Sequence, residues 1–274
     1  MTQRSGPACK LCGKQTQYRF SNLLLGTIEA AYFKCESCDL LQSDHLDHVN
    51  SEDMSGLYAK GEIHDTGAAW RQICICTRLE QLTKLGVIRG MAKRPIRALD
   101  FGAGSGFCVS FMRHRLQWEA YGFDLFSDPT FAKNNIFNSW SDVQARAPFD
   151  VIIASEVFEH FRAPLTEIGK LSEVLSESNG SLFVTTGLFL PEIHDATWHY
   201  LAPQSGQHIC FFGKRTMKEV ARQLRAQICV NLAADYEWLF QRNGSNKPAR
   251  VMQVKLACKV LSIGTKFGIV KKIE

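Results

Sequence analysis

The chain has 274 residues, of which 45% are hydrophobic and 22% charged, an ordinary globular composition. Eighteen Phe and five Trp supply enough apolar area to exclude a mainly disordered chain. The net charge of +5 is only mildly basic, and no long run of Lys or Arg concentrates it, so a nucleic-acid partner is allowed but not required. The N-terminus lacks the apolar core of a signal peptide, and no apolar stretch is as long as a membrane span. We therefore expect a cytoplasmic protein.

The ten cysteines include two close pairs, each with the spacing Cys-x-x-Cys. In a reducing compartment such thiols are free, metal-bound or catalytic rather than disulfide-bonded. Each pair can present two thiolates from a tight turn, and two pairs complete the tetrahedral S₄ site of structural zinc. A metal-free pair of turns is the alternative, and a redox motif is less favoured because no strand–helix context follows either pair. The sequence predicts Zn²⁺ bound by Cys9, Cys12, Cys35 and Cys38.

The segment between the two pairs predicts two short strands, so that residues 1–48 form a zinc ribbon. So small a unit has little core, and metal binding would supply its folding energy. His45 and His48 follow the second pair, but four thiolates already suffice, and we interpret both as part of a polar linker. The linker continues over residues 51–56, where we place the domain boundary. The ribbon carries few basic residues, so nucleic-acid binding by it is not favoured.

After this linker, helical and strand patterns alternate. Helices are predicted over 70–85, 107–116 and 165–175, and strands over 96–101, 120–124, 149–155 and 181–186. This alternation predicts an α/β fold with a Rossmann-like, doubly wound, mostly parallel sheet.

The first of these strands runs into a glycine-rich turn, Leu99-Asp100-Phe101-Gly102-Ala103-Gly104-Ser105-Gly106. Such a turn before a helix exposes backbone N–H groups to a ligand. The dinucleotide fingerprint would require glycine at position 107, which is Phe107, and the chain has no Gly-rich phosphate loop with the Lys-Ser/Thr ending. We therefore expect an adenosine-type cofactor without a cradled pyrophosphate. Asp124 ends the next strand, where a carboxylate can accept both ribose hydroxyls.

Together with Phe149-Asp150-Val151-Ile152 and Val157-Phe158-Glu159-His160-Phe161, these residues resemble the successive motifs of class I S-adenosylmethionine-dependent methyltransferases over about residues 57–240. The resemblance implies that residues 57–274 form a methyltransferase domain, with S-adenosylmethionine (SAM) along the carboxyl ends of the strands. It also implies a set of cofactor-binding residues at those ends, namely Asp100, Gly102, Ala103, Gly104, Gly106, Asp124, Leu125, Ser155 and Glu156.

Two later segments carry a finer resemblance. Trp198-His199-Tyr200-Leu201-Ala202-Pro203 and Gly206-Gln207-His208-Ile209-Cys210-Phe211-Phe212, behind a four-Cys module, are similar to bacterial methyltransferases of sugar and surface-glycan pathways. In the zinc-containing deoxysugar C-methyltransferases, a His in a similar His-x-x-x-Phe segment lies near the substrate. The chain departs from those enzymes after Phe240, because residues 241–274 are too short for their C-terminal substrate domain. We interpret residues 251–273 as a helix that packs on the core.

Methyl transfer requires a nucleophile held in line with the methyl group and, for a neutral acceptor, removal of a proton. A neutral imidazole is the natural base near pH 7. The catalytic candidates are His208, His160 and His199, with Tyr200 as an orienting or proton-relaying group. The expected acceptor is a small molecule or glycan, methylated on oxygen or carbon.

Two other functions stay open at this point. An RNA methyltransferase could use the ribbon as a binding arm, but Ser155-Glu156-Val157-Phe158 stands where amino-group methylation would place Asn/Asp-Pro-Pro-Tyr, and no Pro-Cys nucleophile is present. The other is a non-catalytic protein that binds SAM or a partner. The intact glycine turn and Asp124 argue against loss of the cofactor site.

Overall fold

The structure is a computed structural model. It describes residues 5–49, 66–90, 94–127, 135–233, 236–242, 252–254, 256–257 and 259–260. The chain forms two compact units: unit 1 contains residues 1–64, 156–172 and 186–224, and unit 2 contains residues 65–155, 173–185 and 225–274. The predicted linker over residues 51–56 and most of the predicted C-terminal helix lie outside the described residues. The boundary placed between residues 48 and 57 therefore stays a prediction.

Unit 2 is built on a seven-stranded sheet with the order β11-β12-β9-β8-β5-β6-β7. The strands are β5 (Arg97–Phe101), β6 (Glu119–Phe123), β7 (Ile136–Phe137), β8 (Val151–Ser155), β9 (Ser181–Thr185), β11 (Ile228–Ala233) and β12 (Glu237–Gln241). The five strands from β5 to β9 pair in parallel, whereas β12 pairs antiparallel with both β9 and β11. The predicted α/β fold with a mostly parallel sheet is confirmed.

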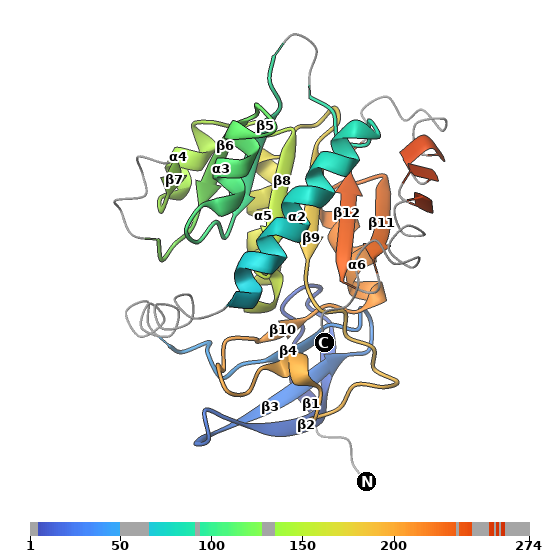
Figure 1. Ribbon diagram of the computed structural model, residues 1–274. Coiled ribbons are helices and arrows are strands. Elements are labelled where there is room, and N and C mark those ends of the chain that lie inside the picture. The colour runs from blue at the N-terminus through green and yellow to red at the C-terminus, as the bar shows by residue number, and fades with distance from the viewer. Residues whose placement is uncertain are drawn as a thin grey trace. The chain divides into compact units, whose positions relative to one another are not determined.

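Helices cover this sheet because its central strands are apolar on both faces. The side chains of Val151–Ala154 in β8 are completely buried. The helices α2 (Thr66–Lys84) and α3 (Phe107–His114) lie on the same face of the sheet (Figure 1), and Leu79 and Met112 belong to its core cluster. Unit 2 also contains α4 (Trp140–Gln144), whereas most of α5 (Pro164–Val174) belongs to unit 1. The β-strand followed by a turn and α3 is the arrangement that the glycine-rich segment predicts.

Unit 1 contains a five-stranded antiparallel sheet with the order β1-β2-β3-β4-β10. The strands are β1 (Ser5–Ala8), β2 (Gln15–Leu24), β3 (Ile28–Cys35), β4 (Leu41–Ser43) and β10 (Cys210–Phe211). The two strands predicted between the cysteine pairs are present as β2 and β3. The last strand comes from a distant part of the chain, and Cys210 lies opposite Gln42 of β4. The ribbon strands are thus the larger part of a sheet that residues 210–211 complete.

Unit 1 also contains α6 (Lys214–Gln223) and the short 3₁₀ helices η3 (Phe158–His160) and η4 (His199–Leu201). Buried aromatic side chains hold η4 against the sheet, because Tyr32, Phe189 and Phe211 share one core cluster with Leu201 of η4. Polar contacts join α6 to the ribbon as well, since the Thr216 hydroxyl donates to the Cys38 carbonyl at 2.6 Å.

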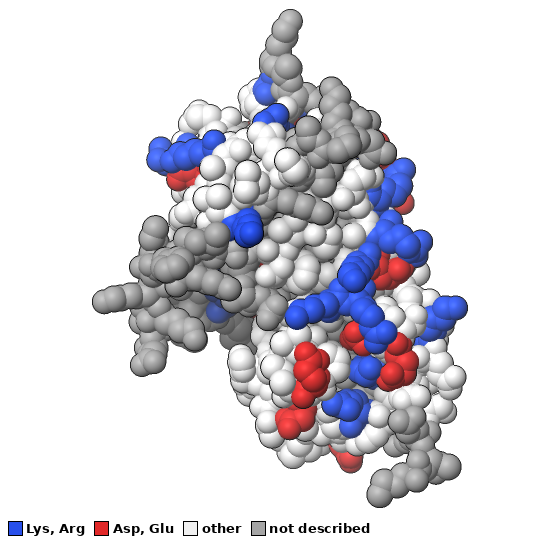
Figure 2. Space-filling view, turned by 90° about the vertical axis from the view of Figure 1, so that its right-hand side faces the viewer, with Lys and Arg blue, Asp and Glu red and all other residues white. Residues whose placement is uncertain are grey.

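The charged surface is mixed in sign. On the face shown in Figure 2, Lys and Arg side chains lie beside Asp and Glu side chains. Two exposed arginines of α6 illustrate this, because Arg215 pairs with Asp39 and Arg222 with Glu219, both at 2.5 Å. Among the described residues, no helix combines the length and the hydropathy needed to cross a bilayer.

Candidate functional site

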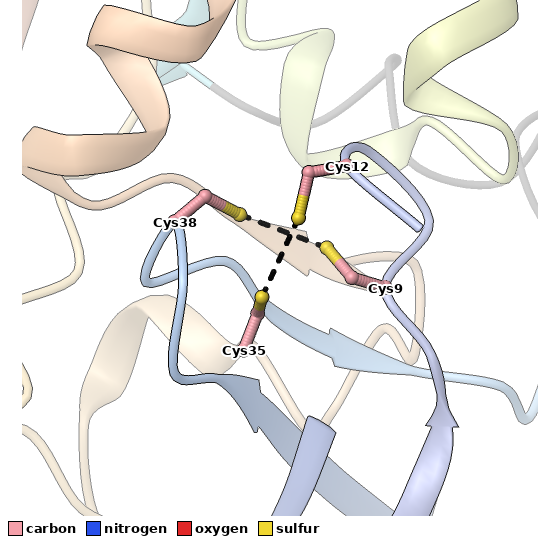
Figure 3. Close-up of side chains that lie close together, drawn as sticks. All are labelled: Cys9, Cys12, Cys35 and Cys38. Carbon is pink, nitrogen blue, oxygen red and sulfur yellow. Dashed lines mark hydrogen bonds between the residues drawn. The ribbon is translucent and has the colours of Figure 1, made fainter. Parts of the chain in front are cut away.

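The four predicted zinc ligands converge in unit 1. The Sγ atoms of Cys9, Cys12, Cys35 and Cys38 all lie within 4.8 Å of one another (Figure 3). Cys9 lies 3.6 Å from Cys38, and Cys12 lies 3.6 Å from Cys35. Each of these close pairs joins one cysteine of the first Cys-x-x-Cys segment to one of the second.

The two cysteine turns share one backbone pattern. In the first, the Gly13 N–H donates to the Cys9 carbonyl at 2.9 Å, and in the second the Asp39 N–H donates to the Cys35 carbonyl at 3.0 Å. The donor residue is left-handed in both turns, with φ of 71° at Gly13 and 61° at Asp39. The Cys9 and Cys35 N–H groups each donate to the carbonyl five residues later, at 2.7 and 2.8 Å. The two turns therefore present their thiols in the same way.

This donor set fits a zinc ion. A tetrahedral ion with Zn–S bonds of about 2.3 Å holds its sulfur atoms about 3.8 Å apart, close to the 3.6 Å of the two measured pairs. The hydrogen bond from Cys38 lowers the pKa of Cys9, whereas burial raises the pKa of Cys12. One thiolate is thus favoured by its neighbours, and the other thiols would ionise on binding a metal. The nine described cysteines are all free of disulfides.

The glycine-rich turn lies in unit 2 at the carboxyl end of β5. Gly102, Gly104 and Gly106 have φ of 82°, 48° and 82°, a left-handed region that glycine adopts at little cost. A Cβ at Gly106 would also collide with the side chain of Ile136. The turn is fastened to β6, because the N–H groups of Gly102 and Ala103 both donate to the Phe123 carbonyl, at 2.7 and 3.1 Å.

Two carboxylates stand at this turn. One Asp124 oxygen accepts the Gly104 N–H at 2.9 Å, and the other accepts the Phe126 N–H at 2.9 Å. Asp124 is half-buried, whereas Asp100 is only 3% exposed. Burial, with the charge of Asp124, raises the pKa of Asp100 to about 7. The turn thus combines backbone N–H groups with one accessible carboxylate and one buried carboxyl group.

The other predicted cofactor residues are placed differently. Leu125 is 64% exposed directly after Asp124. The Ser155 hydroxyl, at the end of β8, lies 2.9 Å from the hydroxyl of Thr185. Glu156 has a φ of 52°, unusual for a residue with a side chain, and its carboxylate lies 3.3 Å from the Tyr200 hydroxyl. The structure therefore groups Glu156 with a predicted catalytic residue.

Three of the four predicted catalytic residues come together in unit 1. We call this set the His–Glu cluster; it comprises Glu159, His160, Thr186, Tyr200 and His208. Glu159 is completely buried, and its two oxygens accept the Tyr200 hydroxyl at 2.7 Å and the Thr186 hydroxyl at 2.9 Å. The rings of His160 and His208 have their centres 5.0 Å apart. The fourth candidate, His199, is exposed at the start of η4.

The hydrogen bonds of both imidazoles define their tautomers. Nδ1 of His208 lies 2.6 Å from the Tyr200 carbonyl, and Nδ1 of His160 lies 3.1 Å from the Gln207 carbonyl. Because a carbonyl only accepts, each Nδ1 carries the proton and each Nε2 carries the lone pair. Burial, together with the neighbouring His208, lowers the pKa of His160 to about 3, and burial also lowers the pKa of His208.

Tyr200 stays protonated in this environment. Burial and the nearby Glu159 and Glu156 carboxylates raise its pKa well above the usual value. Its hydroxyl can therefore donate to Glu159 at neutral pH. The cluster combines two neutral imidazoles, two hydroxyl donors and a buried carboxylate, groups that can orient a polar acceptor and handle its proton.

Sequence reasoning missed two members of this cluster, Glu159 and Thr186. The available signal for Glu159 was its place beside His160 in the motif after β8. Thr186 follows β9 directly, at the end of a strand where polar side chains commonly meet a ligand.

Comparisons with known proteins identify a family for this chain. The sequence matches the family described as "Methyltransferase domain" over residues 73–224. No curated protein matches the chain.

Several solved structures are similar in fold, at low identity. One is an O-methyltransferase family protein from Burkholderia thailandensis, with 15% identity, a TM-score of 0.43, and coverage of 67% of this chain and 62% of that one. Another is the DszA carbon methyltransferase, with 15% identity, a TM-score of 0.47, and coverage of 73% and 60%. The plantazolicin methyltransferase BpumL has 13% identity, a TM-score of 0.41, and coverage of 71% and 92%. The chain thus spans less than two thirds of the length of the first two.

The family match covers more than half of the chain and includes the glycine turn, Asp124 and the whole His–Glu cluster. The chain therefore belongs to the methyltransferase-domain family, while the predicted bounds of the domain, residues 57–274, stay a prediction.

Proposed function

We propose that the protein transfers a methyl group from SAM to oxygen or carbon of a small-molecule acceptor, of which a glycan or other sugar-type compound is the favoured class. The observation that carries the proposal is the glycine turn, where Asp124 accepts the Gly104 N–H and stays half-buried. A carboxylate at this position suits ribose hydroxyls, and the left-handed glycines let a ligand approach the backbone. When bound, SAM supplies an activated methyl group.

The residues of unit 2 then have distinct tasks. Asp124 accepts hydrogen bonds from the ribose, and Leu125 provides an exposed apolar surface for the adenine. The backbone of residues 102–106, with Asp100, surrounds the amino-acid part. Ser155, at the end of β8, and Glu156, the next residue, are further proposed cofactor residues. Glu156 belongs to unit 1, where its carboxylate lies 3.3 Å from the Tyr200 hydroxyl.

The His–Glu cluster of unit 1 acts on the acceptor in this proposal. Its imidazoles and hydroxyls suit an acceptor that carries hydroxyl groups, which is the support for a sugar-type compound. His160, His208 and Tyr200 together bind the reacting group and prepare it to lose a proton. His199 has no place in this step, because it is exposed outside the cluster.

Zn²⁺ at the four-Cys centre is part of the proposal, with a structural role. All four ligand positions are thiols, which leaves no open coordination position of the kind that catalytic zinc uses. Free thiols throughout the described residues suit a reducing compartment, which supports the cytoplasm as the location.

Calorimetric titration of the zinc-loaded protein with S-adenosylhomocysteine tests the cofactor site. We expect binding by the wild-type chain and an affinity at least about tenfold lower for Asp124→Ala, since a charge-assisted hydrogen bond contributes about 1.5–3 kcal/mol. The exposed Asp44 provides the matched control, and Asp44→Ala should bind as the wild type does. No binding by well-folded wild-type protein would contradict the proposed function.

A further inference from the structure

The His–Glu cluster contains a set of donor atoms separate from the four-Cys centre. One ring nitrogen of His160, one of His208 and a carboxylate oxygen of Glu159 all lie within 4.8 Å of one another. Two imidazoles and one carboxylate are a common ligand set for divalent first-row transition metals, and they leave positions open for a further ligand. The question is whether these side chains are arranged as ligands or only as a hydrogen-bonded network.

The two imidazoles have the tautomer that metal ligands commonly have. A ligating His normally donates its second ring N–H to a carbonyl or carboxylate, which fixes the tautomer and aims the other nitrogen. Here both Nδ1 atoms face backbone carbonyls, of Tyr200 for His208 and of Gln207 for His160. With the proton on each Nδ1, Nε2 is the nitrogen of each ring that can coordinate a metal ion.

The carboxylate is supported in the same way. Ligating carboxylates are themselves held by hydrogen bonds. Each oxygen of Glu159 accepts one hydroxyl, from Tyr200 at 2.7 Å and from Thr186 at 2.9 Å. An ionised carboxylate offers about four lone-pair positions, so it can accept hydrogen bonds and bind a cation at the same time. All three donor groups thus have an outer layer of partners that orients them.

We propose that Glu159, His160 and His208 bind one divalent first-row transition-metal ion. The ion would take an acceptor oxygen as a further ligand and lower the pKa of that hydroxyl, so that its proton passes to solvent. The oxygen then takes the methyl group of SAM, and S-adenosylhomocysteine leaves. In this arrangement the two imidazoles hold the ion and do not themselves take the proton. This role rests on the proposed function, whereas the site itself rests only on the three side chains and their partners. Tyr200 and Thr186 are positioning residues in this arrangement.

Titration of the full-length protein, loaded with one equivalent of zinc per chain, with Co²⁺ tests the site by visible absorption. Zinc is retained at the four thiolates because it binds such ligands more tightly than cobalt. We expect one Co²⁺ per chain, with bands of a nitrogen–oxygen site and without thiolate charge-transfer absorption. His208→Gln should weaken Co²⁺ binding at least about tenfold. The matched control is His199→Gln, an exposed imidazole nearby in the sequence, which should bind as the wild type does.

Three results would overturn the proposal: no Co²⁺ bound by folded wild-type protein, Co²⁺ bound only with thiolate absorption, or equal affinity in His208→Gln. Zinc content and circular dichroism report folding. If His208→Gln is unfolded, Tyr200→Phe replaces it, because this variant keeps all three ligands and removes one hydrogen bond to Glu159. It should weaken Co²⁺ binding about tenfold, and unchanged affinity would count against the site.

The same preparation is titrated with S-adenosylhomocysteine. Cofactor binding without Co²⁺ binding removes the metal site and leaves the proposed function standing. Co²⁺ binding without cofactor binding supports the metal site and contradicts the proposed function.

Discussion

The glycine turn of unit 2 and the His–Glu cluster of unit 1 are built in opposite ways. The turn consists mainly of backbone groups from one stretch, residues 102–106, held by the carbonyl of Phe123 and the carboxylate of Asp124. The cluster consists of side chains from four separate places in the chain, around positions 159–160, 186, 200 and 208. A site made of backbone tolerates changes of most side chains but not of its φ angles. A site made of side chains depends on every one of them.

The largest effect should come from the cluster. We expect His208→Ala to lower turnover about 10²–10⁴-fold, the usual range for a positioned group that handles a proton. The affinity for S-adenosylhomocysteine should stay unchanged, since His208 is not part of the glycine turn. Turnover is measured as S-adenosylhomocysteine released from SAM in a mixture of nucleotide sugars and hydroxylated small molecules. Equal losses of turnover and of cofactor affinity would remove the distinction between the two sites, and His199→Ala is the control.

A smaller effect should come from the backbone of the turn. We expect Gly106→Ala to lower the free energy of unfolding by about 1–3 kcal/mol, because φ is 82° and the new Cβ meets Ile136. Gly169→Ala is the matched control, since Gly169 lies within α5 and an added Cβ there meets nothing within 4 Å. The control should be neutral or stabilising by about 0.5–1 kcal/mol. Urea unfolding measures the free energy of unfolding of both variants. Equal values for Gly106→Ala and wild type would show that the turn does not require its left-handed glycine.

The last expectation is a pH dependence set by Asp100. Its pKa is about 7 in the folded chain against an ordinary 3.8, so between these values the folded state binds more protons than the unfolded state. Stability should therefore fall as pH rises from about 4 to about 7, by at most about 1.4 kcal/mol per pH unit. Asp100→Asn should flatten this slope, and Asp44→Asn, at an exposed position, should not. The free energy of unfolding, measured with denaturant at pH 5, 6 and 7, tests this expectation. The same pH dependence of that free energy in wild type and Asp100→Asn would contradict it.

The difference in construction also explains which parts could be predicted. Short local sequence patterns specify the strands β5, β6, β8 and β9, the glycine turn and both cysteine turns. The sequence predicts each of them close to its observed bounds. β10 has only two residues and no periodicity of its own, so its pairing with β4 could not be foreseen. The antiparallel pair β11 and β12 was missed as well.

The cluster was predicted in part for the same reason. Histidine and tyrosine are conspicuous as chemical types, so His160, Tyr200 and His208 could be selected from the sequence. Their assembly around Glu159 depends on how the segments that carry them pack, which no local pattern records. The left-handed backbone of Glu156, which brings its carboxylate to Tyr200, has no sequence signal either.

The closure of the ribbon sheet has a consequence for how the protein is made. The strands β1 to β4 and all four cysteines leave the ribosome early, but β10 and the Thr216 hydroxyl that holds the Cys38 carbonyl come much later, Thr216 lying 178 positions after Cys38. At roughly 5–20 residues per second, the outer edge of β4 waits on the order of ten seconds for its partner. An open edge strand is a pairing site for other chains during that time. Early capture of zinc by the nascent cysteine turns would hold this half-built sheet in its own register until the rest of the chain arrives.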